Sequence, residues 1–247
     1  ERDADSLNVD DTADTFGNTG NLTATDITGL GMTGKIVYGT VESLTIGLGS
    51  GGDTFTVEST HAGTTEVNTN AGNDTVALET ISGVTTVNTA AGSDTVNIRR
   101  IDAATAVNTG GDADTVNVGS LAPVAGGDVN GIGAVLTVNG DGEADSLNVD
   151  DTADTDGNTG SLTATRISGL GMTQPVAYST DVYGPGRSVV SSSLPLARPF
   201  GRGPTRGEGV IHYSQIDNLT IGLGSGDESF TVRDTQADTT TTITAGQ

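Results

Sequence analysis

The sequence of 247 residues contains 37 glycines, 33% hydrophobic residues and only 3% aromatic residues. That is too little bulky apolar material for a compact globule with one large core, but enough for a thin column lined by Val, Leu and Ile. The formal net charge of −22 repels nucleic acid and anionic membranes and attracts cations. The absence of cysteine excludes disulfides and thiolate metal sites. We find no signal peptide and no apolar run long enough for a membrane span.

The first predicted element, residues 2–33, returns almost unchanged at residues 142–173, an offset of 140 residues. Both copies contain the string ADSLNVDDTADT. The chain therefore has two orders of repetition, a short coil and a superunit of several coils. Because the repeats run up to both ends of the sequence, we expect the chain to be a fragment of a longer array.

Between residues 43 and 149, one short sequence motif occurs five times. Each copy has a short alternating run, a glycine-rich turn that ends in an aspartate, and a second alternating run. The spacing of the aspartates is 20 or 21 residues, except where residues 119–134 form a short insertion. A fixed period of this size is typical of a stacked repeat. The five aspartates are Asp53, Asp74, Asp94, Asp114 and Asp145.

Period-two alternation within each coil predicts half-buried strands. In the second copy we expect Val67, Val76 and Leu78 to point inward and Asn68 outward. Stacked coils then place like residues in rows, and no apolar stripe favours a helix. We predict an all-β fold, a single right-handed parallel β-solenoid (a β-roll or β-helix) of about 20-residue coils over 1–247. An immunoglobulin-type sandwich is the alternative, but its strand pairs would not repeat so closely. The rows would be Asn68, Asn88, Asn108 and Asn139, and Thr75, Thr95 and Thr115.

A long insertion, at about 179–213, separates the second superunit from its continuation. Prolines cannot donate to a strand ladder, so we interpret this stretch as a surface loop. A basic docking arm is the alternative. The basis is four prolines and four arginines: Pro185, Pro195, Pro199 and Pro204, with Arg187, Arg198, Arg202 and Arg206.

The row of aspartates raises an electrostatic question. Carboxylates stacked about 4.8 Å apart repel by roughly 1 kcal/mol per pair in water and about 3.5 kcal/mol at the effective dielectric of a protein surface. A Ca²⁺ ion bound by carboxylates and backbone carbonyls would offset this cost. Backbone N–H groups donating to each aspartate would do so without metal. Both hypotheses stay open here. The candidate metal ligands are Asp5, Asp53, Asp74, Asp94, Asp112, Asp114, Asp141, Asp145 and Glu228.

The turns resemble the calcium-binding nonapeptide G-G-x-G-x-D-x-U-x of repeat-in-toxin (hemolysin-type) β-rolls. Gly49, Gly51, Asp53 and Phe55 match its second glycine, fourth glycine, acid and apolar positions. The resemblance implies Ca²⁺ between successive turns, although this chain writes the motif once per coil rather than twice, and Glu228 replaces one acid. The chain also resembles giant bacterial β-strand-repeat proteins. This implies an extracellular or cell-surface stalk or adhesin, with surface glycans or neighbouring repeats as partners.

Other functions are less well supported by the residues. Sugar-cleaving β-helix enzymes need carboxylates at non-repeating positions beside bases and aromatic platforms, whereas these acids are periodic and tryptophan is absent; we expect no enzyme. Ice binding would need regular threonine rows, and Thr54-x-Thr56 decays to Thr75-x-Ala77 in the next coil. The acidic stretch 150–158 is weakly similar to an EF-hand loop, and we expect a solvated loop there. The leading hypothesis is a structural, calcium-binding repeat segment; the alternative is a metal-free structural solenoid.

Overall fold

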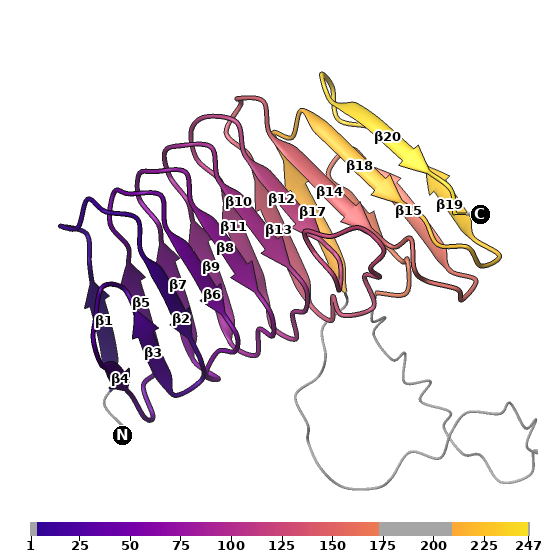
Figure 1. Cartoon of the computed structure of the whole chain (residues 1–247). Helices are drawn as coiled ribbons and strands as arrows, with labels where there is room; N and C mark the ends of the chain where they lie inside the picture. The colour runs from indigo at the N-terminus through magenta and orange to yellow at the C-terminus, as the bar shows by residue number, and fades with distance from the viewer. Residues whose placement is uncertain (1–3, 173–208, 247) are drawn as a thin grey trace, which may run out of the picture.

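The computed structural model describes residues 4–172 and 209–246. This part of the chain is all-β, without helices, and its strands form two ten-stranded sheets, A and B, that face each other along an elongated column (Figure 1). In spatial order, sheet A contains β1 (Ser6–Asp10), β5 (Ser43–Gly47), β7 (Thr64–Asn68), β9 (Val84–Asn88), β11 (Thr105–Asn108), β13 (Val135–Asn139), β17 (Val210–Ser214), β16 (Arg166–Ser168), β15 (Thr159–Thr163) and β19 (Ser229–Val232).

The strands of sheet B are named here from the C-terminal end of the column to its N-terminal end. It contains β20 (Thr240–Thr244), β18 (Asn218–Gly222), β14 (Ser146–Asp150), β12 (Thr115–Val118), β10 (Thr95–Ile98), β8 (Thr75–Leu78), β6 (Thr54–Val57), β2 (Thr19–Leu22), β3 (Asp26–Gly29) and β4 (Lys35–Val37).

From β5 to β14 the chain alternates between the sheets, and each strand pairs in parallel with its counterpart one coil later. Thr75, Thr95 and Thr115 are in register, as predicted. The predicted parallel β-solenoid of about 20-residue coils is therefore confirmed. Connections from sheet A to sheet B, such as residues 48–53, form what we call the aspartate margin. Connections from sheet B to sheet A form the opposite margin.

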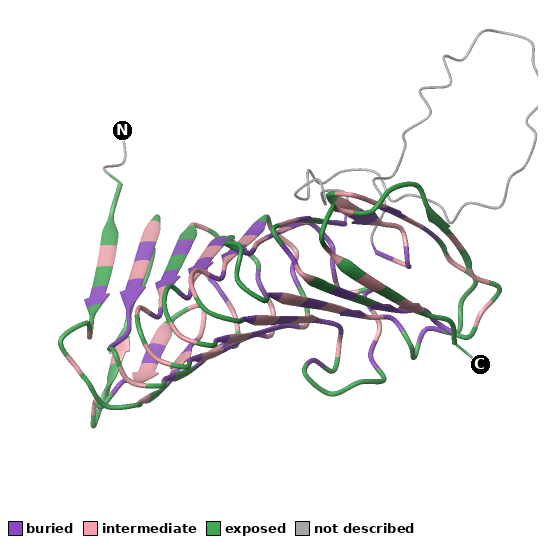
Figure 2. Ribbon diagram, turned by 90° about the horizontal axis from the view of Figure 1, so that it is seen from above, coloured by how far each residue is buried: buried purple, intermediate pink, exposed green. Residues whose placement is uncertain are grey.

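The core consists mainly of aliphatic side chains that pack between the two sheets along the whole column. Figure 2 shows buried residues alternating with less buried ones along the strands. Val67, Val76 and Leu78 are fully buried, which confirms their predicted inward orientation. The residue types explain the strands: β-branched and aliphatic residues at every second position pack well on a pleated, half-buried surface.

The predicted asparagine row forms a hydrogen-bonded ladder along sheet A. Each Nδ2 donates to the Oδ1 of the asparagine one coil earlier, from Asn88 to Asn68 (2.7 Å), Asn108 to Asn88 (2.8 Å) and Asn139 to Asn108 (2.8 Å). A second, shorter ladder follows sheet B, through Asn97, Asn117 and Asn148. The short insertion is fixed over this part of sheet B by a hydrogen bond from Arg99 Nε to the Ala122 carbonyl (2.9 Å).

Two antiparallel meanders interrupt the coils, β2–β3–β4 and β15–β16–β17, and the sequence analysis did not predict them. Their turns are tied by matching tyrosines: the Tyr38 hydroxyl donates to the Thr23 carbonyl (2.5 Å) and the Tyr213 hydroxyl to the Thr163 carbonyl (2.6 Å). The two superunits also occupy opposite sheets, since β1 lies in sheet A and its sequence copy β14 in sheet B.

Of the predicted long insertion at 179–213, residues 179–208 lie outside the described residues, and residues 210–213 already belong to β17. The predicted short insertion at 119–134 leaves the coil at the opposite margin, and Ile132 returns to the column beside Ile101.

The glycine turns of the aspartate margin require glycine where adjacent coils come closest. Gly92 has φ of +120°, and a Cβ built there would collide with the backbone carbonyl oxygen of Gly72. We therefore expect Gly92→Ala to lower the free energy of unfolding by at least about 2 kcal/mol, because it combines backbone strain with a clash that rigid backbone cannot relieve. Gly34→Ala is the matched control, since no atom lies within 4 Å of its Cβ position. Urea unfolding should separate the two variants, and equal midpoints would contradict the prediction.

Candidate functional site: the aspartate column

The five repeat aspartates stand directly before the sheet B strands, at the aspartate margin, and they line up as one column. All five are buried, with exposed fractions of only 1–3%. Their place follows from the turn. The glycine-rich connection brings the chain back toward sheet B, and the aspartate is the last residue before the strand begins. The predicted alignment of like residues is therefore confirmed for Asp53, Asp74, Asp94, Asp114 and Asp145.

Each carboxylate caps the backbone of the preceding coil. The backbone N–H of one aspartate donates to the side-chain oxygen of the aspartate in the next coil, so that the column is continuous. A carboxylate that accepts a backbone N–H makes a charge-assisted bond, roughly twice as strong as a neutral one. The bonds run from Asn18 to Asp53 (2.7 Å), Asp53 to Asp74 (2.7 Å), Asp74 to Asp94 (2.7 Å), Asp94 to Asp114 (2.7 Å), Asp114 to Asp145 (3.0 Å) and Asp145 to Asp217 (3.1 Å).

Asp217 is a member of the column that the sequence analysis missed. The signal was present, because Asp217-Asn218-Leu219 stands before β18 as Asp145-Ser146-Leu147 stands before β14. The long insertion of 35 residues before Asp217 interrupts the period and obscured that correspondence.

The second carboxylate oxygen differs among the members of the column, and that of Asp145 accepts from the backbone N–H of Asp141 (3.2 Å). Oδ2 of Asp53, Asp74, Asp94 and Asp114 is buried and has no hydrogen-bond partner among the described residues. Burial disfavours the charged form. It raises the pKa of Asp94 to about 6 and that of Asp114 to about 7, and the carboxylates of neighbouring coils add to this.

The remaining predicted ligands do not join the column. Asp112 and Asp141 are exposed beside it in the same turns. Asp5 lies at the opposite margin, before β1, where its backbone N–H donates to Glu42 Oε2 (2.8 Å). Glu228, before β19, also lies at the opposite margin. The superunits occupy opposite sheets, which the sequence spacing did not reveal, so the grouping of Asp5 and Glu228 with the column was wrong.

The column fits the capping hypothesis better than a calcium site. Ca²⁺ takes six to eight oxygen ligands, whereas each aspartate here has one oxygen already bonded to backbone. In the part of the chain that the structure describes, no group of three or more acidic or histidine side chains is arranged to hold a metal ion. Calcium binding stays a prediction.

The acidic stretch 150–158 differs from the expected solvated loop. Asp151 is fully buried and Asp154 is 6% exposed. Both clamp the short insertion: Asp151 Oδ1 accepts from the Val129 N–H (3.1 Å), and Asp154 Oδ2 accepts from Asn130 Nδ2 (3.1 Å). Burial raises the pKa of Asp151 to about 7. The prediction of a solvated loop is confirmed for residues 152, 153 and 155–157, which are exposed, but it was wrong for Asp151 and Asp154, because the short insertion covers them.

Comparison with known proteins adds no family. No family model, curated protein or solved structure matches the chain. The resemblance to calcium-binding repeats stays a prediction. None of the described segments forms a helix that could cross a bilayer.

The capping role predicts different results for two substitutions of Asp94. Asp94→Asn keeps an Oδ1 acceptor for the Asp74 N–H and removes a buried charge, so stability at pH 8 should be unchanged or higher. Asp94→Ala leaves that N–H without an acceptor and should cost about 1–3 kcal/mol. Thermal melts of both variants test this, and an Asp94→Asn protein as unstable as Asp94→Ala would indicate a role for the charge itself.

The raised pKa values also predict a pH dependence. Asp94 and Asp114 titrate in the folded protein near 6 and 7, against an ordinary value of 3.8. Between about pH 4 and pH 7 the folded state thus holds more protons than the unfolded state, and stability falls as pH rises through this window. We expect a lower melting temperature at pH 8 than at pH 5. Asp114→Asn should flatten the profile, and a profile that rises from pH 5 to pH 8 would contradict the assignment.

Proposed function

We propose that the chain is a structural repeat segment, a stiff spacer whose columns of like side chains hold its coils together without a metal ion. One observation carries the proposal: the aspartate column, in which each coil from that of β5 and β6 to that of β11 and β12 donates a backbone N–H to a carboxylate of the next. These hydrogen bonds connect each coil to the next, so their role is to keep the coils stacked.

The lining of one hollow, as far as the described residues 4–172 and 209–246 form it, supports a structural role. This hollow of about 680 Å³ between β15, β16 and β19 is lined by glycines, small polar residues, Met172 and Arg233, and the described residues place no carboxylate or histidine in it. General acid–base chemistry needs such groups within reach of the same bond. That the chain is no enzyme stays a prediction.

The setting of this spacer is part of the proposal. The net charge of −22 and the lack of cysteine suit a protein exposed to a cation-rich exterior, and the resemblance to bacterial repeat proteins points to the cell surface. We propose an extracellular or surface-attached stalk, with neighbouring repeats or surface glycans as partners.

Calcium loading is the second candidate, and the unpartnered Oδ2 atoms favour it. The two candidates differ in one measurement. If the column is self-sufficient, EDTA leaves the β circular dichroism signal and the melting temperature unchanged, and millimolar CaCl₂ raises the latter no more than MgCl₂ does by screening. A sharp loss of stability in EDTA, restored by calcium alone, would overturn the metal-free proposal.

A further inference from the structure

The chain contains two pairs in which an asparagine is followed directly by a glycine, Asn130 with Gly131 and Asn139 with Gly140. In such a pair the backbone nitrogen of the glycine can attack the side-chain carbonyl carbon of the asparagine, because glycine has no side chain to hinder the approach and adopts conformations that other residues rarely reach. The reaction needs a glycine N–H that is not held in a hydrogen bond and an asparagine amide that can turn. The structure separates the two pairs on these requirements.

The pair of Asn139 and Gly140 is locked at the end of β13. The Gly140 N–H donates to the Ser214 carbonyl (3.0 Å). The Asn139 amide is held on both sides, since Nδ2 donates to Asn108 Oδ1 (2.8 Å) and Oδ1 accepts from Ser214 Oγ (3.0 Å). Both reacting groups are therefore fixed by the neighbouring coils, and Asn139 can react only after the sheet opens locally.

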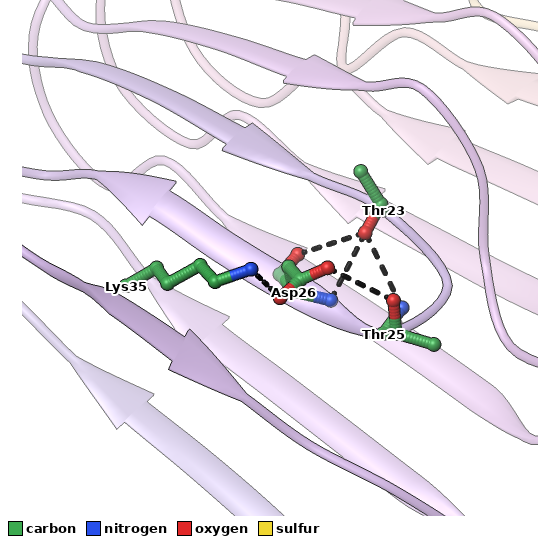
Figure 3. Close-up of polar contacts among 4 residues, drawn as sticks. All are labelled: Thr23, Thr25, Asp26 and Lys35. Atoms are coloured by element: carbon green, nitrogen blue, oxygen red, sulfur yellow. Dashed lines mark hydrogen bonds and ion pairs between the residues drawn. The ribbon is translucent and has the colours of Figure 1, made fainter.

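The turn between β2 and β3 shows how a turn of this chain satisfies its N–H groups. Thr23 Oγ1 accepts from the backbone N–H of Thr25 (3.3 Å) and from that of Asp26 (3.0 Å), so both nitrogens are engaged (Figure 3). Gly131, in the turn of the short insertion, differs, because its N–H has no hydrogen-bond acceptor among the described residues. Asn130 beside it is exposed to solvent. Asn130 and Gly131 are thus the pair that is free to react.

The Asn130 side chain belongs to the contact between the short insertion and the acidic stretch 150–158. Three carboxylates of that stretch each accept one hydrogen bond from the insertion, so the contact needs a donor at each of three places. Two of the donors are backbone N–H groups, and the third is a side-chain amide nitrogen, the one that the reaction expels. The bonds run from the Gly127 N–H to Asp150 Oδ2 (2.8 Å), from the Val129 N–H to Asp151 Oδ1 (3.1 Å) and from Asn130 Nδ2 to Asp154 Oδ2 (3.1 Å).

We propose that Asn130 is a site of spontaneous deamidation and that this modification releases the short insertion from the acidic stretch. The Gly131 nitrogen bonds to Asn130 Cγ, the amide nitrogen leaves as ammonia with the proton of the Gly131 N–H, and a succinimide ring remains. Water then opens the ring at either carbonyl and leaves aspartate or isoaspartate at this position. Water is the only other reactant, and neither an enzyme nor an oxidant is needed.

The product reverses the contact with Asp154 from attraction to repulsion. Where Nδ2 donated, a carboxylate now faces a carboxylate that is only 6% exposed, and like charges repel most strongly where water is excluded. Asp128 adds to this repulsion, since its Oδ1 accepts from the Asn130 N–H (3.1 Å). The insertion therefore lifts away near residues 127–130 and leaves Asp151 and Asp154 open to water. The coils stay stacked, because the bonds of the aspartate column do not involve the insertion.

Peptide mapping by mass spectrometry tests the site of reaction. The folded chain and the chain in urea are incubated side by side at pH 8, and the loss of amide from each of the two asparagines is followed with time. In urea both should react at similar rates. In the folded chain Asn130 should react at least about tenfold faster than Asn139, because only Asn139 has to wait for local opening. Equal rates in the folded chain, or an Asn130 that stays intact while the urea sample reacts, would overturn the proposal.

Two variants test the release of the insertion. Asn130→Asp carries the charge of the product, and Asn130→Ser is the matched control, which loses the bond to Asp154 without adding a charge. Hydrogen exchange at residues 127–130 should be at least about tenfold faster in Asn130→Asp than in fresh wild type, since a hydrogen bond to a charged group is replaced by repulsion. Asn130→Ser should fall between them, and wild type aged at pH 8 should come to match Asn130→Asp.

Hydrogen exchange in β8, β10 and β12 is the internal reference and should be the same in all samples. An Asn130→Asp protein that exchanges like fresh wild type, or one whose central strands loosen as much as the insertion does, would contradict the proposed release. The inference does not depend on the metal-free structural role, because the EDTA experiment measures the stacking of the coils, whereas these measurements follow the insertion.

Discussion

Parallel stacking in register is the constraint on which the rest of this structure depends. When strands pair in parallel at a fixed spacing and each coil repeats the last, every residue stands directly above its namesake. A valine above a valine extends a core, and an asparagine above an asparagine donates and accepts in the same direction through every coil. The same rule places an aspartate above an aspartate, which is unfavourable unless something compensates.

The compensation lies in the backbone. The turn before each sheet B strand leaves an N–H pointing along the column, and the carboxylate one coil away accepts it. One oxygen is satisfied in this way while the other stays buried and unpartnered, and this is why the pKa of Asp114 rises to about 7. The column is therefore a compromise between a strong capping bond and the repulsion and desolvation of like groups.

Each meander lengthens one of the two sheets by adding antiparallel strands, and it does so without adding a full coil. β2–β3–β4 extends sheet B at one end, and β15–β16–β17 extends sheet A near the other. Because the two superunits start in opposite sheets, these extensions fall on opposite sides, and each end is stepped.

The sequence by itself determined the coil, the inward and outward residues, the asparagine and threonine rows and the alignment of five aspartates. These features follow from the alternation of apolar and polar residues within each coil and from the fixed spacing between coils, and every coil shows both patterns. It did not determine which sheet each superunit starts in, so it grouped Asp5 and Glu228 with the aspartate row, whereas both lie at the opposite margin. The meanders, and the cover that the short insertion provides for Asp151, were missed as well.

Only the tertiary structure decided these points, because they depend on how segments distant in the chain pack together. The chain passes between the two sheets an odd number of times from β1 to β14, so the second superunit begins in the other sheet. A local alternating pattern does not record that number. The same reason explains the aspartates: their alignment is a matter of period, but the bond that each one makes depends on where the neighbouring coil presents its N–H.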